Sequence, residues 1–368
     1  MHVVSPHHEP RRGPSAGWLA GVVLAALSVV VAACGANPAS PSPVGSPALA
    51  SASIGPASSP SAPTAAGSPG TSAPAASPDS GASLPPALAS GFRVHAYALL
   101  PLGLGQRAYA DWTDATVAID YPADSHGVPV YTRKGKRYLH PVSAAQQGLR
   151  QLATYVKTQD PVFLDRAQVI ADALVAAGVK ADGALWIPYR FDFNLHGKAA
   201  DVMRAPWYSG MAQGQVLSLV SRLYELTGKA RDLDAARRIF ASFAVVGMRS
   251  KPWVSWVERR YLWLEEYPGK PPDHTLNGFI FALYGIYDFY EVTHSAAAAR
   301  VFQGGLTTVR HYLPEFRNPG GISHYCLLHL VLSPKYHHIH IGQLRQLRTM
   351  TGDAFFATMA DLFASDHQ

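Results

Sequence analysis

Apolar residues recur at helical spacing through most of the second half of the chain. Leu217, Val220 and Leu223 lie three residues apart in one stretch, and residues 283–289 repeat the pattern in another. Such spacing places apolar side chains on one face of a helix. From Gln146 to the C-terminus, the sequence therefore predicts an overwhelmingly helical structure.

Four of the predicted helices form an internal repeat. Each contains a glycine in a similar apolar setting, and the glycines are 66, 64 and 64 residues apart: Gly148, Gly214, Gly278 and Gly342. A helical hairpin that recurs at a fixed period buries its apolar face only by stacking on its neighbours. We expect a mainly α fold, an α/α barrel or partial toroid of about four helical hairpins. The repeated glycine indicates either a close approach of two helices or a direct contact with substrate.

Upstream of the repeat, the pattern changes to short alternating stretches. Residues 116–120 and 127–131 have the composition of strands, and Lys134–Lys136 is a plausible tight turn leading into Tyr138. We expect a small N-terminal β-hairpin over the mouth of the helical domain. Residues 91–104 show no pattern that we interpret.

The first 34 residues have the layout of an export signal. Arg11 and Arg12 precede an uncharged apolar run over residues 18–33, which is short for a membrane span but suits a signal-peptide core. Residues 31–34 resemble a bacterial lipobox, in which Cys34 becomes the lipid-modified N-terminus of the mature protein. An uncleaved N-terminal anchor with an incidental cysteine is the alternative. Either interpretation predicts an exported protein held at the cell membrane, on its extracytoplasmic side.

Residues 35–90 are expected to be a disordered tether. They hold 12 of the 29 prolines and one charged residue, Asp79, among Ser, Ala and Gly. Such a segment cannot bury enough apolar surface to offset its ordering entropy. Three regions follow: a lipoprotein signal peptide with its lipobox cysteine over 1–34, the tether over 35–90, and a catalytic domain over 91–368.

The predicted domain carries all the net charge of the chain. From residue 91 onward there are 29 Lys and Arg against 23 Asp and Glu, which equals the formal net charge of +6 for the whole sequence. This excess suits an acidic polymer as partner, and no nucleic-acid motif accompanies it. Two cysteines exclude a disulfide-stapled scaffold. Cys326, the cysteine of the domain, is either a buried inert thiol or a nucleophile.

Three stretches concentrate functional side chains near predicted helix starts. Residues 205–213 include Trp207 and Tyr208, which could stack on a sugar ring. Residues 263–268 include Glu265 and Glu266, which form either a solvated acidic loop or a pair that holds a proton through like-charge repulsion. Residues 323–329 and 336–340 combine histidines with tyrosines, which indicates acid–base chemistry, substrate contacts or structural hydrogen bonds rather than a metal site. We expect no cofactor and no metal.

These stretches also carry a family resemblance. Residues 207–215, 265–268, 276–279 with 287–288, and 336–344 look like the C-terminal domain of D-glucuronyl C5-epimerases, and residues 127–149 are similar to the N-terminal hairpin of that family. The resemblance covers roughly residues 120–362. Members convert D-glucuronate into L-iduronate in heparan-type polysaccharides, and their helical domain is an α/α barrel of hairpins.

The resemblance implies roles for particular residues. In the family, a glutamate and a tyrosine on opposite faces of the sugar exchange the C5 proton, and these match Glu266 and Tyr336. Tyr267 and Tyr325 match tyrosines that line the same site. Residues expected to contact substrate are Tyr208, Asn277, Tyr138, Gln146, His329 and His340.

The chain departs from the heparan-type enzymes in two respects. It lacks room for their large β-barrel domain, because only about 60 residues, expected to be largely helical, separate Gln146 from Trp207. It also carries Leu328 where they have an arginine just before the histidine that matches His329. Lys136, Arg137, His329 or Arg204 are candidates to bind the acidic substrate in its place.

The sequence thus predicts an exported, lipid-tethered uronate C5-epimerase that acts on a uronate-containing polysaccharide and meets the membrane through its lipid anchor. A uronate lyase that uses the same C5 deprotonation is an alternative. A non-catalytic glycan-binding surface lipoprotein is another.

Overall fold

The computed structural model describes residues 91–113, 122–247 and 252–367. The expected signal peptide, Cys34, the tether and the strand at residues 116–120 lie outside these ranges. Among the described residues, none of the helices combines the length and the apolar character needed to cross a membrane.

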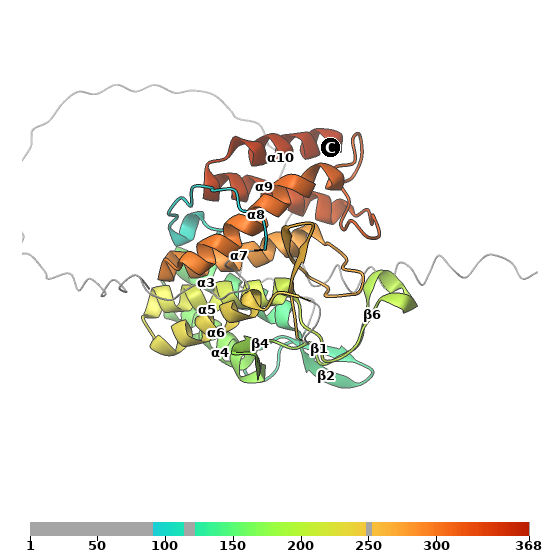
Figure 1. The fold of residues 1–368 in the computed structure, drawn as a ribbon. Helices are drawn as coiled ribbons and strands as arrows, with labels where there is room; N and C mark the ends of the chain where they lie inside the picture. The colour runs from blue at the N-terminus through green and yellow to red at the C-terminus, as the bar shows by residue number, and fades with distance from the viewer. Residues whose placement is uncertain (1–90, 114–121, 248–251, 368) are drawn as a thin grey trace, which may run out of the picture.

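In the described ranges, eight α-helices pair into four consecutive hairpins, which Figure 1 shows stacked side by side. Their bounds are α3 Pro141–Thr158 with α4 Pro161–Ala177, α5 Gly210–Thr227 with α6 Ala230–Ala244, α7 Leu276–Thr293 with α8 Ala296–Phe316, and α9 Pro334–Thr351 with α10 Ala354–Asp366. The first helix of each hairpin ends at a residue with left-handed backbone, namely Gln159, Gly228, His294 and Gly352. Such a cap stops a helix abruptly, so each partner helix can begin within a few residues and run back along the first.

The first helices of the hairpins form an inner layer and the second helices form an outer one. Within the inner layer, α3 packs on α5, α5 on α7, and α7 on α9, while α4, α6, α8 and α10 cover the outside. Helix α5 is buried from Gly210 to Leu223 and α7 from Leu276 to Phe289, because both lie in the middle of this arc. The predicted α/α fold of four hairpins, a partial toroid, is confirmed.

The glycines of the repeat do not all have the same structural role. A Cβ at Gly214 would run into the backbone of Ala282 where α5 crosses α7, and one at Gly148 would lie 2.6 Å from a methyl group of Leu219. Close helix approach therefore explains these two positions. At Gly342 a Cβ would meet nothing within 4 Å, so there the expectation of close approach is wrong.

Four two-stranded antiparallel hairpins accompany the helices in the part of the chain that the structure describes. They are β1 Val130–Arg133 with β2 Lys136–Leu139, β3 Val179–Ala181 with β4 Ala184–Trp186, β5 Phe193–Asn194 with β6 Val202–Met203, and β7 Ser255–Glu258 with β8 Tyr261–Leu264. The first is the predicted N-terminal hairpin, which turns at Lys134 and Gly135, both with positive φ. The strand expected over 127–131 begins only at Val130.

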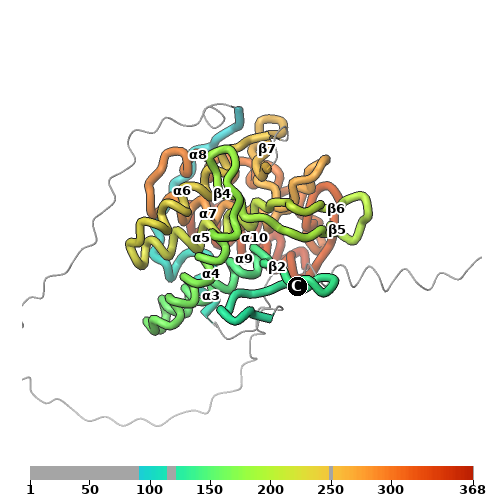
Figure 2. Tube along the Cα trace, turned by 90° about the horizontal axis from the view of Figure 1, so that it is seen from below, coloured from blue at the N-terminus to red at the C-terminus, as the bar shows by residue number. Residues whose placement is uncertain are grey.

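The other three hairpins were not anticipated. The stretch between α4 and α5 was expected to be largely helical, but it consists of β3 to β6 with two short 3-10 turns, η2 (Leu195–Gly197) and η3 (Ala199–Asp201). Figures 1 and 2 both place β2 and β6 at the same side of the molecule. They lie at the end where the inner helices begin.

Residues 91–113 span the opposite end of the helices, where they are drawn in cyan in Figure 1. The Leu100 N–H donates to the carbonyl of Met350 in α9, and Thr154 in α3 donates to the carbonyl of Thr113. The segment includes a 3-10 turn, η1 (Leu104–Gln106). It therefore connects the two ends of the inner arc and closes one end of the barrel.

A buried charge network holds this closed end. Arg222 in α5 donates two hydrogen bonds to Asp288 in α7, at 2.9 and 3.2 Å, and a third to the carbonyl of Ala108. Arg107 pairs with Glu225 at 2.7 Å and with Glu291 at 3.5 Å. Asp288 belongs to a stretch that resembles the epimerase family, and its role in this structure is to bind α5 to α7.

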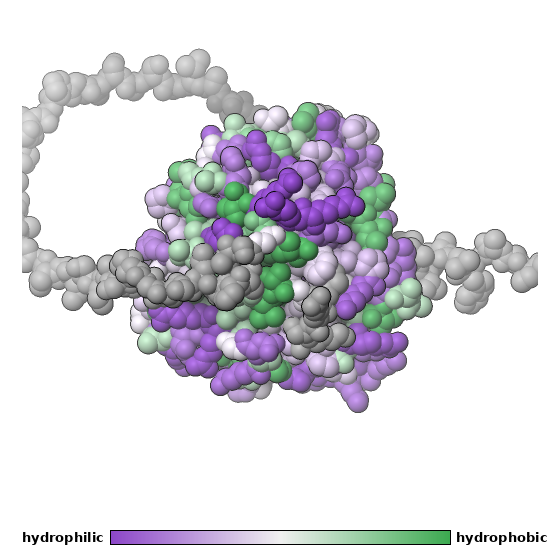
Figure 3. Space-filling model, in the orientation of Figure 1, coloured by the Kyte–Doolittle hydropathy of each residue, from purple (hydrophilic) through white to green (hydrophobic). Residues whose placement is uncertain are grey.

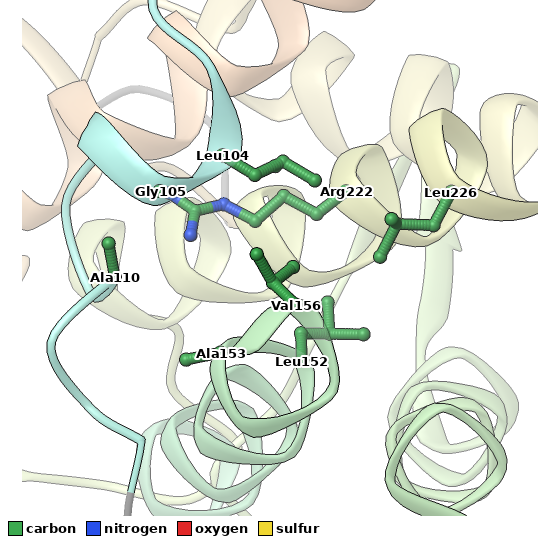
Figure 4. A pocket seen from close by; sticks show the side chains of 8 residues that line it. All are labelled: Leu104, Gly105, Ala110, Leu152, Ala153, Val156, Arg222 and Leu226. Carbon is green, nitrogen blue, oxygen red and sulfur yellow. The ribbon is translucent and has the colours of Figure 1, made fainter. Parts of the chain in front are cut away.

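A small cavity of about 20 Å³ lies near the closed end (Figure 4). It is large enough for about one water molecule and includes none of the predicted site residues. Its lining residues are Leu104, Gly105, Ala110, Leu152, Ala153, Val156, Arg222 and Leu226. On the face in Figure 3, hydrophobic residues form a strip near the middle and smaller patches at the left and right margins, among mostly hydrophilic residues.

Candidate active site

The candidate site lies at the end of the barrel where the inner helices begin, opposite the end that residues 91–113 close. The β7–β8 hairpin positions it, because all four residues of β8 are buried and the chain continues straight into Glu265 and Glu266. The Glu265 N–H donates to the carbonyl of Val254, and the Glu265 carbonyl accepts from Gly210 at the start of α5, each at 2.7 Å. Glu266 is thus held between a hairpin and the first turn of an inner helix.

Glu266 and three tyrosines form one buried cluster. The Tyr325 hydroxyl lies 3.5 Å from Glu266 Oε2 and 3.4 Å from the Tyr267 hydroxyl. The ring of Tyr336, in the first turn of α9, lies 4.4 Å from the ring of Tyr325. All four side chains are at least nine-tenths buried. The structure therefore brings together the four residues predicted to be catalytic, although they come from separate parts of the chain.

Burial changes the acid–base properties of the cluster. It raises the pKa of Glu266 from 4.5 to about 8, assisted by the negative charge of Asp273 and opposed by hydrogen bonds from the tyrosines. Burial also raises the pKa of Tyr267 and of Tyr325 well above 10. Near neutral pH the two tyrosines are therefore protonated hydrogen-bond donors. The pKa of Glu266 lies close to neutral pH, so this carboxyl group can gain or lose a proton there.

Glu265 has a different role from its neighbour. Its carboxylate accepts from His274 Nδ1 at 2.6 Å and from the His274 N–H at 3.1 Å, while His274 Nε2 contacts Glu258 at 3.0 Å. Glu265 and Glu266 do not share a proton as a pair. Burial is the main cause of the high pKa of Glu266, and the charge of Glu265 contributes less than that of Asp273.

An aromatic wall flanks the cluster. Trp207 stacks on Tyr189 with ring centroids 3.9 Å apart, and Phe193 stacks on Tyr267 at 5.8 Å. Trp207 is 7% exposed and donates through Nε1 to the carbonyl of Phe191. The expectation that Trp207 offers a face to a sugar ring is therefore wrong, because other aromatic rings already cover it.

The residues expected to contact substrate differ in their burial and in their neighbours. Tyr208 is half-buried and edge-on to Trp186, and Tyr138 packs on Phe191 at 5.4 Å. Neither contact joins the Glu266 cluster. His340 lies one helical turn below Tyr336 on α9 and is fully buried, with Nδ1 2.9 Å from the hydroxyl of Ser323.

Asn277 and Gln146 carry buried amides without a protein partner among the described residues. Both amide atoms of Asn277 and the Nε2 of Gln146 make no hydrogen bond. Gly278, next to Asn277, allows the Glu266 side chain to approach α7, because a Cβ there would overlap the carboxyl group. Buried polar atoms are normally satisfied, so the unpaired amide of Asn277, the residue before Gly278 on α7, is suited to a ligand.

A second polar cluster lies beside Tyr325, and the sequence analysis identified it only in part. Its members are His196, Asp273, Cys326 and His329, whose ligand-type atoms all lie within 4.8 Å of one another. Burial would raise the pKa of Asp273, but hydrogen bonds from His196, Thr275 and His329 outweigh it and hold the pKa below its ordinary value. His196 and Asp273 belong to loops without a repeat or a motif of their own, so no sequence signal marked them.

The remaining candidates for binding an acidic group are engaged or lie elsewhere. Arg204 is exposed and pairs with Asp192 at 2.7 Å. His329 lies between two carboxylates, with Nδ1 2.8 Å from Asp273 and Nε2 3.2 Å from Asp201. Lys136 and Arg137 are exposed on β2. Cys326 is fully buried, and burial raises the pKa of its thiol to about 12, which disfavours a nucleophile.

Comparison with known proteins gives matches over the part of the chain that carries this site. Residues 182–365, half of the chain, match the family model described as D-glucuronyl C5-epimerase C-terminus. An uncharacterized protein of Methanocaldococcus jannaschii is 30% identical over 171 residues, 46% of this chain and 53% of that protein. The D-glucuronyl C5-epimerase of Caenorhabditis elegans is 24% identical over 183 residues, 44% of this chain and 29% of the relative.

Among solved structures, a cellobiose 2-epimerase from Bacillus thermoamylovorans is similar with a TM-score of 0.46 at 13% identity, over 67% of this chain and 66% of that one. The matched region thus spans about half, or less, of the curated relatives. The helical hairpins define the class of protein as an α/α domain built from four consecutive helical hairpins in the described residues. Within that class, the chain belongs to the D-glucuronyl C5-epimerase C-terminal family.

Proposed function

We propose that this chain is a uronate C5-epimerase that inverts C5 of D-glucuronate residues in an acidic polysaccharide. The observation that carries the proposal is the buried cluster at the end of the barrel where the inner helices begin, in which a glutamate with a pKa of about 8 lies among Tyr267, Tyr325 and Tyr336. Membership of the family supports the same chemistry.

The reaction needs a base and an acid that act on C5 from opposite faces. In the first half, the C5–H bond breaks, its proton moves to the base, and the electron pair delocalises into the adjacent carboxylate as an enediolate. In the second half, the acid returns a proton to the other face and the configuration inverts. Glu266 and Tyr336 are the two proton-exchanging groups by the family resemblance. A carboxyl group with a pKa of about 8 suits this exchange near neutral pH.

The neighbouring phenols stabilise the intermediate. Removing a proton next to a carboxylate places a second negative charge beside the first, and fixed hydrogen-bond donors in a buried site lower that cost. Tyr325 and Tyr267 keep their protons because their pKa values lie well above 10. The Asn277 amide supplies further unpaired polar atoms for the sugar.

Deuterium exchange tests the proposal. The chain is incubated in D₂O with unsulfated heparosan, and we expect deuterium at C5 together with L-iduronate. Glu266→Gln and Tyr336→Phe should each lower the exchange rate on the order of 100-fold, while the matched controls Glu315→Gln and Tyr290→Phe, on α8 and at the far end of α7, should leave it unchanged.

The same experiment separates the alternatives. An unsaturated, ultraviolet-absorbing uronate with no deuterium in recovered substrate would identify a lyase and overturn the proposal. Glycan binding that persists in both active-site variants, with no exchange by the wild-type chain on a panel of uronate polymers, would identify a binding protein.

Export and lipid tethering are part of the proposal and are supported by the sequence of residues 1–90. An acylated Cys34 with a long uncharged tether would hold the domain outside the cell membrane within reach of surface polymers. Metabolic labelling with an alkyne fatty acid tests whether Cys34 is acylated and holds the chain at the membrane. The wild-type chain should be labelled and membrane-bound, and Cys34→Ser should lose both the label and the membrane association.

A further inference from the structure

The His196 cluster has the composition and the convergence of a metal centre. Its four members supply two imidazole nitrogens, one carboxylate oxygen and one sulfur, a donor set typical of tetrahedral Zn²⁺ sites. They come from three segments: η2, the loop before α7 and the loop between α8 and α9. Side chains from three separate segments meet at one point, with no lysine or arginine paired to Asp273 in the part of the chain that the structure describes.

Three separations between ligand-type atoms of the cluster are close to those of a tetrahedron around zinc. With Zn–N and Zn–O near 2.0–2.1 Å and Zn–S near 2.3 Å, neighbouring ligand atoms lie about 3.3–3.6 Å apart. His196 Nε2 is 3.2 Å from Asp273 Oδ1 and 3.6 Å from Cys326 Sγ, and His329 Nδ1 is 2.8 Å from Asp273 Oδ1. The first two separations are within about 0.1 Å of the tetrahedral values, and a displacement of His329 by about half an ångström would bring the third to them.

The outer contacts of the cluster are those that metal ligands usually make. The atom Oδ1 of Asp273 faces both histidines, while Oδ2 accepts from the Thr275 hydroxyl at 2.5 Å. Ring nitrogen Nε2 of His329 lies 3.2 Å from Asp201 Oδ2. A carboxylate on the far nitrogen of a histidine orients the ring and its tautomer in metal sites.

A hydrogen-bonded network without an ion is the competing explanation. In that arrangement His329 donates from both ring nitrogens, because each one faces a carboxylate. With a cation at Nδ1, a neutral ring satisfies both contacts, since Nε2–H donates to Asp201 and the lone pair of Nδ1 binds the ion. Cys326 would bind the ion through its sulfur, which in the network without an ion contacts His196 Nε2 at 3.6 Å.

We propose that His196, Asp273, Cys326 and His329 bind one Zn²⁺ ion in a closed structural site. Four protein ligands complete the tetrahedron, so the ion positions the chain rather than activating water. It joins the β5–β6 connection and the loop before α7 to the loop that carries Tyr325, which directly precedes Cys326. This departs from the expectation of no metal. It does not rest on the proposed function, because the ion is measured in the resting protein.

Metal analysis of the full-length chain, purified through a tag that binds no metal, tests the proposal. We expect about one zinc per chain in the wild type and less than a tenth of that in His329→Ala. The control His338→Ala, an exposed histidine on α9, should retain full occupancy. Occupancy below a tenth in the wild type after incubation with zinc would overturn the proposal, as would equal occupancy in His329→Ala.

Cobalt substitution gives a second measurement that does not need a variant to fold. Co²⁺ added to the zinc-free wild-type chain should produce the intense visible bands of a tetrahedral ion and a thiolate-to-cobalt charge-transfer band. In Cys326→Ser the charge-transfer band should disappear. Its absence in the wild type, or its persistence in Cys326→Ser, would show that Cys326 is not a ligand. Neither result depends on C5 exchange, so failure of the zinc site and failure of the epimerase proposal are distinguishable.

Discussion

Glu266→Gln removes one titrating carboxyl group from the buried cluster and keeps its size. In the folded chain the pKa of Glu266 is about 8, against 4.5 for an ordinary glutamate, and burial is the main cause. Between those two pH values the unfolded chain releases this proton while the folded chain keeps it. The stability that Glu266 contributes is therefore fully present below about pH 4.5 and is lost as pH rises to about 8.

The size of the effect follows from the shift. Each pKa unit corresponds to about 1.4 kcal/mol, so the change from 4.5 to about 8 has an upper limit of about 5 kcal/mol. Local relaxation and entry of water reduce the cost of a buried charge, which makes about 2–4 kcal/mol the expected range. Glutamine carries no titrating proton, so the variant escapes this loss and gains stability relative to the wild type as pH rises.

Denaturant unfolding of both chains between about pH 5 and about pH 9, in buffer with a chelator, measures this difference. Groups that titrate in both chains contribute equally to the two free energies of unfolding and cancel in their difference. That difference should favour Glu266→Gln increasingly toward high pH. The exposed Glu315→Gln on α8 is the control and should stay within about 0.5 kcal/mol of the wild type throughout. Parallel curves for the wild type and Glu266→Gln would refute the reasoning, because they would mean that burial does not shift this carboxyl group.

The remaining predictions concern the helical scaffold and its approach to the site. Arg222→Leu removes both hydrogen bonds to the buried Asp288, which then has only the longer 3.6 Å ion pair with Arg107, and should lower the unfolding free energy by about 3 kcal/mol. Arg231→Leu breaks an exposed pair and should cost less than about 1 kcal/mol in the same denaturation assay. Gly214→Ala should lower the melting temperature through a backbone clash, and Gly342→Ala should raise it slightly, since an exposed helical glycine costs about 0.5–1 kcal/mol relative to alanine. Gly278→Ala should displace the neighbouring carboxyl group and slow C5 exchange on the order of 100-fold, and an unchanged rate would contradict this role.

Much of the scaffold was predictable because its rules are local. Helical periodicity and a recurring glycine indicated four hairpins, and the helices occupy those segments. The N-terminal β-hairpin followed from its turn residues, Lys134 and Gly135. The segment between α4 and α5 was predicted wrongly as largely helical, because its short strands are stabilised by packing against α6 and by aromatic contacts that leave no period in the sequence.

Residues of the candidate site could be predicted only where they belong to a motif that resembles the family. Glu266, Tyr267, Tyr325 and Tyr336 were identified through a family resemblance, and the structure brings them together. The aromatic character of Trp207 suggested that it could stack on a sugar ring, while the structure stacks it on Tyr189.

The sequence by itself determined the helical hairpins, the order of the repeats and the candidates for proton exchange, because periodicity, caps and motifs act over neighbouring residues. Only the tertiary structure decided which side chains share a site and in what protonation state. Desolvation of Glu266 and the meeting of His196 with Asp273 and Cys326 arise from segments far apart in the chain. Their interactions depend on distance and burial in three dimensions, which no local pattern in the sequence encodes.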